Sequence, residues 1–475
     1  MGVGNLFVMC GIVAIVSRPA SRPTPAAGDL LAQLDRAVAA GSLAEAAQLV
    51  GTADALLHGV PGVLALAGRS ELVAGITARL DQIDARIADR ERLLETATLT
   101  PDEIEASSAE LLAIRDAVWA VRRDRLDNAA AVDELAGRDA GPAALAGYLA
   151  IQQALAAIDR MEVRGRDSAG IHVMVWGHGL DVAHPAVSAA LHQRGLDPLF
   201  QDGSVRFEAG VLGFAYKAAA EIGELGDNVR ALRNGVVNDS LLRLALSHPE
   251  ARVSVLGHTR WASVGIISEP NCHPVNSEQS ELTGSEQAAV PYVVAVLNGD
   301  VDNHADIKVN HGLRIAGPIT TDAKVIPALM AQHAAHGSSL AESFRRTVAE
   351  FEGSVAIAAA SADAPDQVYL ALRGSGQALY VGLGGKPEDF APGGTVNPAV
   401  MGLAKELMGK VPNALAQLPK VATMEAGKRN DYANGWMRKN IQDELAAARG
   451  AMVSDPGKTE YYSPPGCSAC SPFTG

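Results

Sequence analysis

The stretch that decides the fold of this chain lies near its start and reads Met9-Cys10-Gly11-Ile12-Val13-Ala14-Ile15-Val16. A cysteine and a glycine followed by an apolar, β-branched run predict a buried strand with the cysteine at its mouth. If Met9 and the residues before it are removed, Cys10 carries a free α-amine beside its thiol. An unperturbed α-amine has a pKa of about 7.7–8.0, and an unperturbed thiol has one of about 8.5. One residue can therefore supply both a nucleophile and its base near neutral pH.

Two plainer interpretations compete with a reactive Cys10. The start of the chain is apolar like a secretory signal or membrane anchor, but it lacks a basic n-region and a small-residue cleavage site, and glycines interrupt it. A free cysteine taken alone is more often a core residue. Three polar islands downstream favour the reactive interpretation: Arg-Gly-Arg-Asp-Ser-Ala-Gly at 164–170, His-Thr-Arg-Trp-Ala-Ser at 258–263 and Leu-Asn-Gly-Asp at 297–300.

Composition narrows the class of protein. The 475 residues suffice for two or three domains, and 48% apolar with 20% charged residues is the composition of an ordinary globular protein. No stretch has the length and apolar character of a membrane span. The net charge of −14 disfavours nucleic acid and anionic membranes as partners. Four cysteines do not make a disulfide framework, so we expect a cytoplasmic protein.

A helical region is expected to interrupt the chain after its first strand, which we place at 10–17. Residues 18–155 are rich in alanine, leucine and charge, and helical spacing of four and three marks a seam of Leu72, Ile76, Leu80, Ile83 and Ile87. A second seam starts at Ile104, after a capping box of Thr100 and Glu103 around Pro101. The pattern predicts a helical hairpin. It is either a partner-binding or oligomer arm, or a solvated insertion, and the narrow seam favours the insertion.

The remainder of the chain divides into a mixed α and β part and a tail. We expect strands at 253–256, 292–297, 355–359, 368–372 and 378–383, and helices at 155–161, 322–333 and 339–350. Residues 156–384 are thus assigned, with 10–17, to one domain. Residues 1–9 are interpreted as a leader or propeptide, and 385–475 as a Pro/Gly linker followed by a weakly ordered C-terminal tail.

Taken in order, the islands identify a family. The chain resembles the glutaminase domain of glucosamine-6-phosphate synthases (glutamine–fructose-6-phosphate aminotransferases), which are class II glutamine amidotransferases. The matching segments are Cys-Gly-Ile-Val at 10–13, the Arg-Gly-x-Asp-Ser-Ala-Gly loop at 164–170, His-Thr-Arg-Trp-Ala at 258–262, Ser-Glu-x-Asn-x-His-Pro at 268–274, Asn-Gly-x-x-x-Asn-His at 298–304 and Thr-Asp-x-x-Val-Ile at 321–326.

The resemblance implies both a fold and a reaction. The fold would be α+β, a four-layer αββα N-terminal-nucleophile hydrolase sandwich with the helical hairpin inserted. The reaction would hydrolyse L-glutamine to glutamate and ammonia through a thioester on Cys10. The ammonia would pass to an acceptor domain or subunit, with fructose 6-phosphate as the expected sugar-phosphate acceptor. We expect no cofactor and no metal.

Chemistry and resemblance together assign the site residues. Amide hydrolysis needs donors for an oxyanion, and the Asn298 side chain and the Gly299 backbone N–H are suitable. An Asn-Gly pair alone predicts a hairpin turn, and the resemblance favours the oxyanion role. It implies that Arg260 binds the substrate carboxylate and that Asp322 binds its ammonium. The remaining residues expected to bind substrate are Arg164, Gly165, Trp261, Ser263 and His273.

Departures from the family pattern leave alternatives open. Ser263 and Val264 stand where the synthases have threonine and histidine, and Arg166 stands where tyrosine is common. The 90 residues after Gly385 are too few for the sugar-isomerase domains (475 minus 385). The alternatives are a subunit that serves another acceptor and a non-catalytic glutamine sensor or scaffold. A homo-oligomer is left open. The pair Cys467 and Cys470 lacks the second half of a zinc site.

Overall fold

The strand that follows Cys10 lies at one edge of an antiparallel sheet. The computed structural model describes residues 10–20, 22–96, 100–137, 139–219, 224–280, 290–374 and 379. Its first sheet has five strands in the order β1-β5-β2-β4-β3. They are β1 (Gly11–Val16), β2 (Ser168–Trp176), β3 (Val205–Glu208), β4 (Val211–Ala218) and β5 (Arg252–Arg260). In the register Gly11 pairs with Thr259, so the nucleophile's strand ends beside the end of β5.

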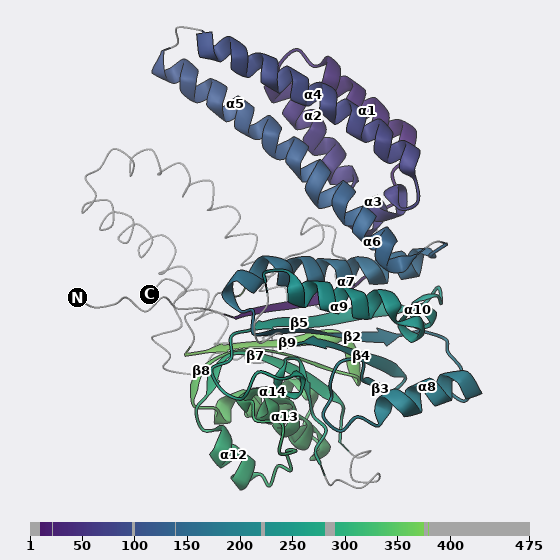
Figure 1. The fold of residues 1–475 in the computed structure, drawn as a ribbon, viewed down its shortest axis with the longest axis vertical. Helices are drawn as coiled ribbons and strands as arrows, with labels where there is room; N and C mark the ends of the chain where they lie inside the picture. The colour runs from purple at the N-terminus through teal and green to yellow at the C-terminus, as the bar shows by residue number, and fades with distance from the viewer. Residues whose placement is uncertain are drawn as a thin grey trace, which may run out of the picture.

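A second antiparallel sheet faces the first (Figure 1). Its order is β6-β7-β8-β9, with β6 at Val275–Asn276, β7 at Val293–Val301, β8 at Gly353–Ser361 and β9 at Ala364–Arg373. An apolar core lies between the sheets and includes Met174 and Leu256 from the first and Val294, Val296 and Ala358 from the second. Because this core is fed by alternate residues of both sheets, the two sheets are fixed face to face.

Helices cover the outer face of each sheet. The first sheet packs against α7 (Pro142–Met161), α9 (Asp227–Asn238) and α10 (Ser240–Leu246) in a large core. The second sheet packs against α13 (Val325–Ala335) and α14 (Leu340–Glu350). Two shorter helices complete this part, α8 (Pro185–Gly195) and α12 (His304–Asn310). The α+β class expected from the sequence is confirmed.

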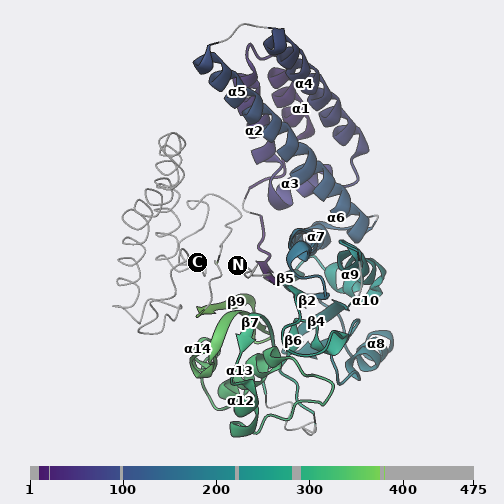
Figure 2. The same ribbon diagram turned by 60° about the vertical axis from the view of Figure 1, so that its left-hand side comes forward.

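A separate bundle of helices projects from the first sheet's side (Figures 1 and 2). It contains α1 (Ala27–Ala39), α2 (Leu43–Leu56), α3 (Gly59–Leu66), α4 (Ser70–Thr96) and α5 (Pro101–Trp119). The predicted seam is buried, and the Thr100–Glu103 capping box is confirmed by hydrogen bonds in both directions. The bundle is larger than the expected hairpin, because α4 packs mainly on α1 and α5 mainly on α2.

The bundle joins the sheets through a continuous helical path. A π-helical stretch, Ala120–Asp127, leads from α5 into α6 (Asn128–Ala136), whose apolar residues enter the same core as the first sheet. The helix α7 covers that sheet from Pro142 onward, ahead of the insertion boundary expected at 155. The sequence pattern misplaced this boundary because α7 is as rich in alanine and leucine as the bundle.

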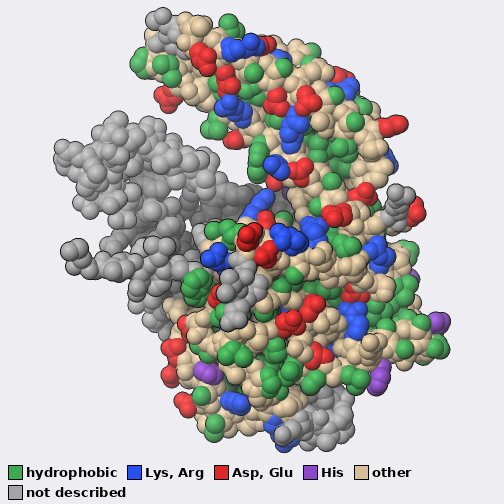
Figure 3. Space-filling model, viewed as in Figure 1, with side chains coloured by type: hydrophobic (Ala, Val, Ile, Leu, Met, Phe, Trp, Pro, Cys, Tyr) green, Lys and Arg blue, Asp and Glu red, His purple; other side chains and the backbone are tan. Residues whose placement is uncertain are grey.

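The bundle surface carries charges of both signs, as Figure 3 shows on one face. Arg122 forms ion pairs with Asp81 and Asp84 at 2.7 Å, which ties the end of α5 to α4. Within the described ranges, no single helix is long and apolar enough to cross a membrane, and one pair bent by 90°, α2 with α3, passes only by combined length and composition. The expected strand at 378–383, the leader, the tail and Cys467 and Cys470 lie outside the described residues.

Candidate active site

Cys10 lies at the mouth of β1, where the first sheet meets the segment that follows β5. Its Sγ accepts a hydrogen bond from the Trp261 backbone N–H at 3.0 Å. The next residue is fixed as well, because the Gly11 N–H donates to the Thr259 hydroxyl at 3.1 Å. A side chain at Gly11 would overlap Met161, so this position needs glycine. The thiol is thus half-buried and held by backbone on both sides.

The surroundings keep this sulfur protonated until a base acts on it. Burial raises the pKa of the Cys10 thiol, and the carboxylate of Asp167 adds a smaller increase. The Trp261 N–H and the positive charge of Arg260 act in the opposite direction, because both stabilise a thiolate. The site therefore supports a thiolate once formed but needs a nearby proton acceptor to form it.

Asn298 and Gly299 lie on β7 directly opposite the nucleophile. The Asn298 Nδ2 donates to the Cys10 backbone carbonyl at 2.5 Å, although the two residues are 288 positions apart in the chain. Gly299 has φ +122°, and any side chain there would overlap the Ser354 carbonyl of β8. The Asn-Gly pair lies inside a strand that continues to Val301, so it does not form the hairpin turn that the dipeptide alone predicts.

Arg260 ends β5, and its guanidinium organises the segment that follows. It donates to the carbonyls of Ile266 at 3.3 Å, Gly265 at 3.3 Å and Val264. Burial lowers the pKa of Arg260, while the nearby Cys272, Asp322 and Cys10 oppose that change. Among the described residues no carboxylate lies within 4.0 Å of this guanidinium. A buried positive charge without an ion pair can accept the carboxylate of a ligand.

Asp322 begins a short helical turn, Asp322–Lys324, below the end of β7. Its Oδ2 accepts from the Val301 N–H at 2.7 Å. Burial raises the pKa of the Asp322 carboxyl, whereas the Val301 N–H lowers it and the neighbouring Asp300 carboxylate raises it. The side chain is nearly inaccessible, at 4% exposure. A cation bound beside it would stabilise its charged form.

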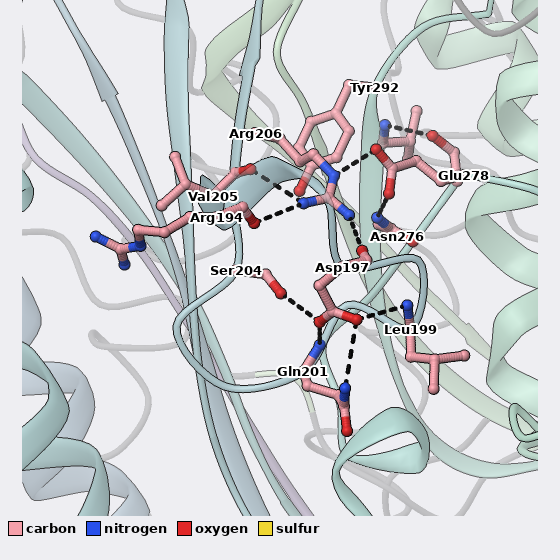
Figure 4. A network of polar contacts seen from close by, with 12 residues as sticks. Arg194, Asp197, Leu199, Gln201, Ser204, Val205, Arg206, Asn276, Glu278 and Tyr292 are labelled. Carbon is pink, nitrogen blue, oxygen red and sulfur yellow. Dashed lines mark hydrogen bonds and ion pairs between the residues drawn. The ribbon is translucent and has the colours of Figure 1, made fainter. Parts of the chain in front are cut away.

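The turn that carries Asp322 is anchored from behind by a polar network (Figure 4). The Lys324 Nζ donates to the backbone carbonyl of Asn276 at 2.6 Å and to its side-chain oxygen at 2.9 Å. The Asn276 amide in turn donates to Glu278 at 2.7 Å, and Glu278 accepts from Arg206 of β3 at 2.5 Å. Because the chain of contacts crosses from the second sheet to the first, it fixes the turn relative to both.

The loop before β2 approaches the end of β5 very closely. A Cβ at Gly165 would lie 3.0 Å from the Arg260 carbonyl carbon and 3.1 Å from the Trp261 nitrogen. Asp167 completes the contact, since its N–H donates to the Arg260 carbonyl at 3.1 Å and its Oδ2 accepts from Ala262 N–H at 2.8 Å. This loop thereby sets the position of the backbone that holds Cys10 Sγ. Of Arg164 the structure describes the backbone alone.

His273 lies under the site and not at its surface. Its Nε2 is 3.1 Å from the Thr321 hydroxyl, and its ring centroid is 4.7 Å from that of His258. Burial lowers the pKa of His273 well below its usual value and that of His258 to about 3, so both rings are neutral. His273 therefore supports Thr321, the residue before Asp322, and no printed contact takes it to Cys10.

The structure thus brings Cys10, Asn298, Gly299, Arg260 and Trp261 together, with Asp322 within electrostatic reach. Ser263 lies on the same loop, and Gly165 braces it from below. The sequence analysis gave no role to Asp167, Asn271 or Glu162. Asn271 accepts from the N–H groups of Thr320 and Thr321 at 2.7 and 2.9 Å, and it belongs to a quoted motif, so its part in the site was within reach. Glu162 holds Gly226 and Asn228 at the start of α9, and no sequence signal links those positions.

Comparison with known proteins confirms the resemblance read from the motifs. No family model matches the chain. A curated glutamine–fructose-6-phosphate aminotransferase (isomerizing) of Bacillus thuringiensis subsp. konkukian is 34% identical over 129 residues, 27% of this chain and 19% of that protein. One from Streptococcus mutans is 34% identical over 145 residues, 30% of this chain and 22% of that protein. One from Gloeobacter violaceus is 30% identical over 197 residues, 41% and 29% of the two chains.

These relatives are much longer than the matched region. The chain spans between 19% and 29% of the length of the curated relatives just described. Among solved structures, an allosteric regulatory enzyme of purine biosynthesis has a TM-score of 0.24 at 17% identity, covering 43% of this chain and 37% of that one. The glutamine phosphoribosylpyrophosphate amidotransferase of Bacillus subtilis has a TM-score of 0.23 at 16% identity, with the same coverage of 43% and 37%.

Proposed function

We propose that this chain is a glutamine amidotransferase domain that hydrolyses L-glutamine to glutamate and ammonia, with Cys10 as the nucleophile. One observation carries the proposal. The Cys10 thiol accepts from the Trp261 N–H, while the Asn298 amide reaches the carbonyl of the same cysteine. A sulfur nucleophile and an amide donor from distant segments thus meet at one point, as amide hydrolysis requires.

The reaction follows from the residues at that point. With residues 1–9 removed, the α-amine of Cys10 takes the thiol proton, and the sulfur attacks the carbonyl carbon of the glutamine side-chain amide. The oxyanion that forms is stabilised by the Asn298 amide and the Gly299 N–H. The α-amine then returns its proton to the leaving nitrogen, the C–N bond breaks, and ammonia departs from a thioester. Water attacks the thioester, which releases glutamate and restores the thiol.

Substrate recognition is assigned to the charges around the nucleophile. Arg260 receives the α-carboxylate, because its buried guanidinium contacts only carbonyl oxygens among the described residues. Asp322 receives the α-ammonium. Trp261, exposed at 47%, covers the bound substrate from the loop. Gly165 and Arg164 belong to the loop that lines the pocket, Ser263 lies on its rim, and His273 supports it from below.

The proposal includes an architecture and an acceptor. The two facing sheets with helices outside them support a four-layer αββα N-terminal-nucleophile sandwich, into which the helical bundle is inserted. The curated relatives are named for fructose 6-phosphate, and we assign a sugar phosphate as the class of acceptor. Since the chain spans under a third of those relatives, the acceptor site belongs to a separate domain or subunit.

A labelling experiment tests the function directly. The purified chain is incubated with L-glutamine, and ammonia and glutamate are measured; an electrophilic glutamine analogue is then added and the labelled residue is located by mass spectrometry. Glutamine hydrolysis and labelling at Cys10 are expected, and both should vanish in Cys10→Ala. Cys272→Ala is the matched control, because that thiol is fully buried and donates to the Ala169 carbonyl at 3.0 Å. Labelling elsewhere, or activity that survives in Cys10→Ala, contradicts the proposal.

A further inference from the structure

One side-chain hydrogen bond crosses from the loop after β5 to the end of β7. The Ser263 hydroxyl donates to the Asp300 Oδ1 at 2.6 Å. This distance is that of a charge-assisted O–H···O⁻ bond, which is stronger than a neutral one. The two residues lie on the elements that flank the nucleophile, because β7 carries Asn298 and the loop carries Trp261.

Asp300 faces the same side of β7 as Asn298. Side chains alternate along a strand, so residues 298 and 300 point the same way, and Asn298 points at Cys10. Asp300 is also near Asp322, to which the substrate ammonium is assigned, since its charge adds to the pKa increase there. Among the described residues, no cation lies within ion-pair distance of the Asp300 carboxylate. Its hydrogen-bond partner on the loop is therefore the neutral Ser263.

The loop has other fixed points, and they lie at its base. Arg260 holds the carbonyls of Val264 to Ile266 from beneath, and Asp167 holds the N–H of Ala262. The Ile266 N–H donates to the Thr320 hydroxyl at 3.3 Å. Ser263 is exposed at the rim, so its bond to Asp300 joins the outer edge of the loop to the second sheet.

A serine hydroxyl has one proton to donate and two lone pairs with which to accept. In Ser263 that proton goes to Asp300, so the oxygen can act toward a ligand only as an acceptor. An ammonium group carries donors alone, whereas a carboxylate or an amide oxygen carries acceptors. A Ser263 oriented in this way favours an α-ammonium on its side of the pocket and disfavours the carboxylate, which leaves the carboxylate to Arg260.

We propose that Asp300 is a positioning residue that fixes the Ser263 hydroxyl, so that Ser263 closes the loop over Cys10 and accepts a hydrogen bond from the α-ammonium of the substrate. This inference rests on the glutaminase function proposed above and deepens it. It gives the site a built-in preference for substrates with a free α-amino group. Residue 300 follows the proposed oxyanion donor Gly299 directly, so the same strand end serves the reaction and the recognition of the substrate.

The test compares two substrates across four variants of the active chain. L-Glutamine is paired with glutaramate, which has the same carboxylate and side-chain amide but no α-amine. Ser263→Ala, Asp300→Ala and the double variant should each lower kcat/KM for L-glutamine about tenfold, the loss expected for one hydrogen bond to a charged group. None should change kcat/KM for glutaramate by more than about twofold, on the same reasoning. Ser263→Thr retains the hydroxyl and should behave like the parent protein.

The double variant separates a shared role from two independent ones. If Asp300 acts through Ser263, the double variant should lose no more than either single variant, because residues in one hydrogen-bond chain are not additive. Full additivity, or a silent Ser263→Ala beside a damaged Asp300→Ala, overturns the proposal. Equal losses for both substrates do so as well, because a merely disordered loop would impair glutaramate too.

A second readout does not depend on glutamine. Trp261 lies two residues before Ser263, and its quenching by iodide, taken as the difference from Trp261→Phe, reports how the loop is held. Quenching should increase in Ser263→Ala and Asp300→Ala and stay unchanged in Ser263→Thr. If the parent protein does not hydrolyse glutamine, the proposed function fails, and the quenching result alone decides whether Asp300 holds the loop. Unchanged quenching in both alanine variants overturns the positioning role.

Discussion

Acid should destabilise the core between the two sheets, and His172 allows the effect to be isolated. This β2 residue is 1% exposed, and its Nε2 lies 3.0 Å from the Tyr292 hydroxyl of the facing sheet. Burial, with the nearby charges of Lys217 and Arg206, lowers the pKa of His172 to about 3. The ring is therefore neutral in the folded protein at every pH at which the fold is expected to survive.

The size of the effect follows from proton linkage. An unfolded histidine has a pKa of about 6.5, so below that pH the unfolded state binds a proton that folded His172 refuses. Because the folded pKa is the lower one, stability falls as the pH drops through 6.5 and continues to fall toward about 3. Between pH 7 and pH 5 the linkage relation gives a loss of about 2 kcal/mol from this residue.

Urea unfolding of the parent protein and of His172→Gln, at pH 7 and pH 5, measures that loss. Trp176 packs against the inter-sheet core, so tryptophan emission follows its unfolding. The parent should lose about 2 kcal/mol more than the variant when the pH is lowered. His192→Gln is the control, since that ring is exposed on α8 and should leave the pH dependence unaltered. An equal loss in the parent and in His172→Gln refutes the account of a buried neutral ring.

Three further substitutions test the site. Asn298→Ala should lower kcat for glutamine about a hundredfold or more, the usual cost of one oxyanion donor, and a silent change in steady-state kinetics removes that assignment. Arg260→Lys should mainly raise KM, because a point charge replaces a two-pronged donor; a loss confined to kcat contradicts carboxylate binding. Gly165→Ala should lower kcat about tenfold by displacing the backbone that contacts Cys10, with its closest neighbour at 3.0 Å, and unimpaired kcat shows that the loop tolerates the shift.

The sequence predicted those parts of the fold whose signals are local. The seam from Leu72 to Ile87 and the cap at Thr100 depend on neighbours within one or two helical turns, and both are confirmed. The strand cores at 253–256, 292–297 and 355–359 lie inside β5, β7 and β8. By contrast β3, β4 and β6 were not predicted. The Arg206–Glu278 pair at their edge joins residues 72 positions apart, which no periodicity reveals.

The candidate site shows the same division. Its residues were predicted because the chain resembles a family, and the structure gathers Cys10, Trp261 and Asn298 at one point. Their supports were missed where the partner is remote. Glu162 is 1% exposed and binds the N–H of Gly226 at 2.5 Å, a contact that depends on how α7 meets α9. Such supports follow from tertiary packing, and a single sequence carries no record of it.

The central claim is that Cys10 acts as both nucleophile and base, and the state of its nitrogen tests this most directly. Two preparations are compared after intact-mass measurement, one that begins at Cys10 and one that retains Met1 to Met9. The first should hydrolyse glutamine, and the second should be inactive, because an amide nitrogen cannot take the thiol proton. Full glutaminase activity in protein whose measured mass still includes residues 1–9 would contradict the account.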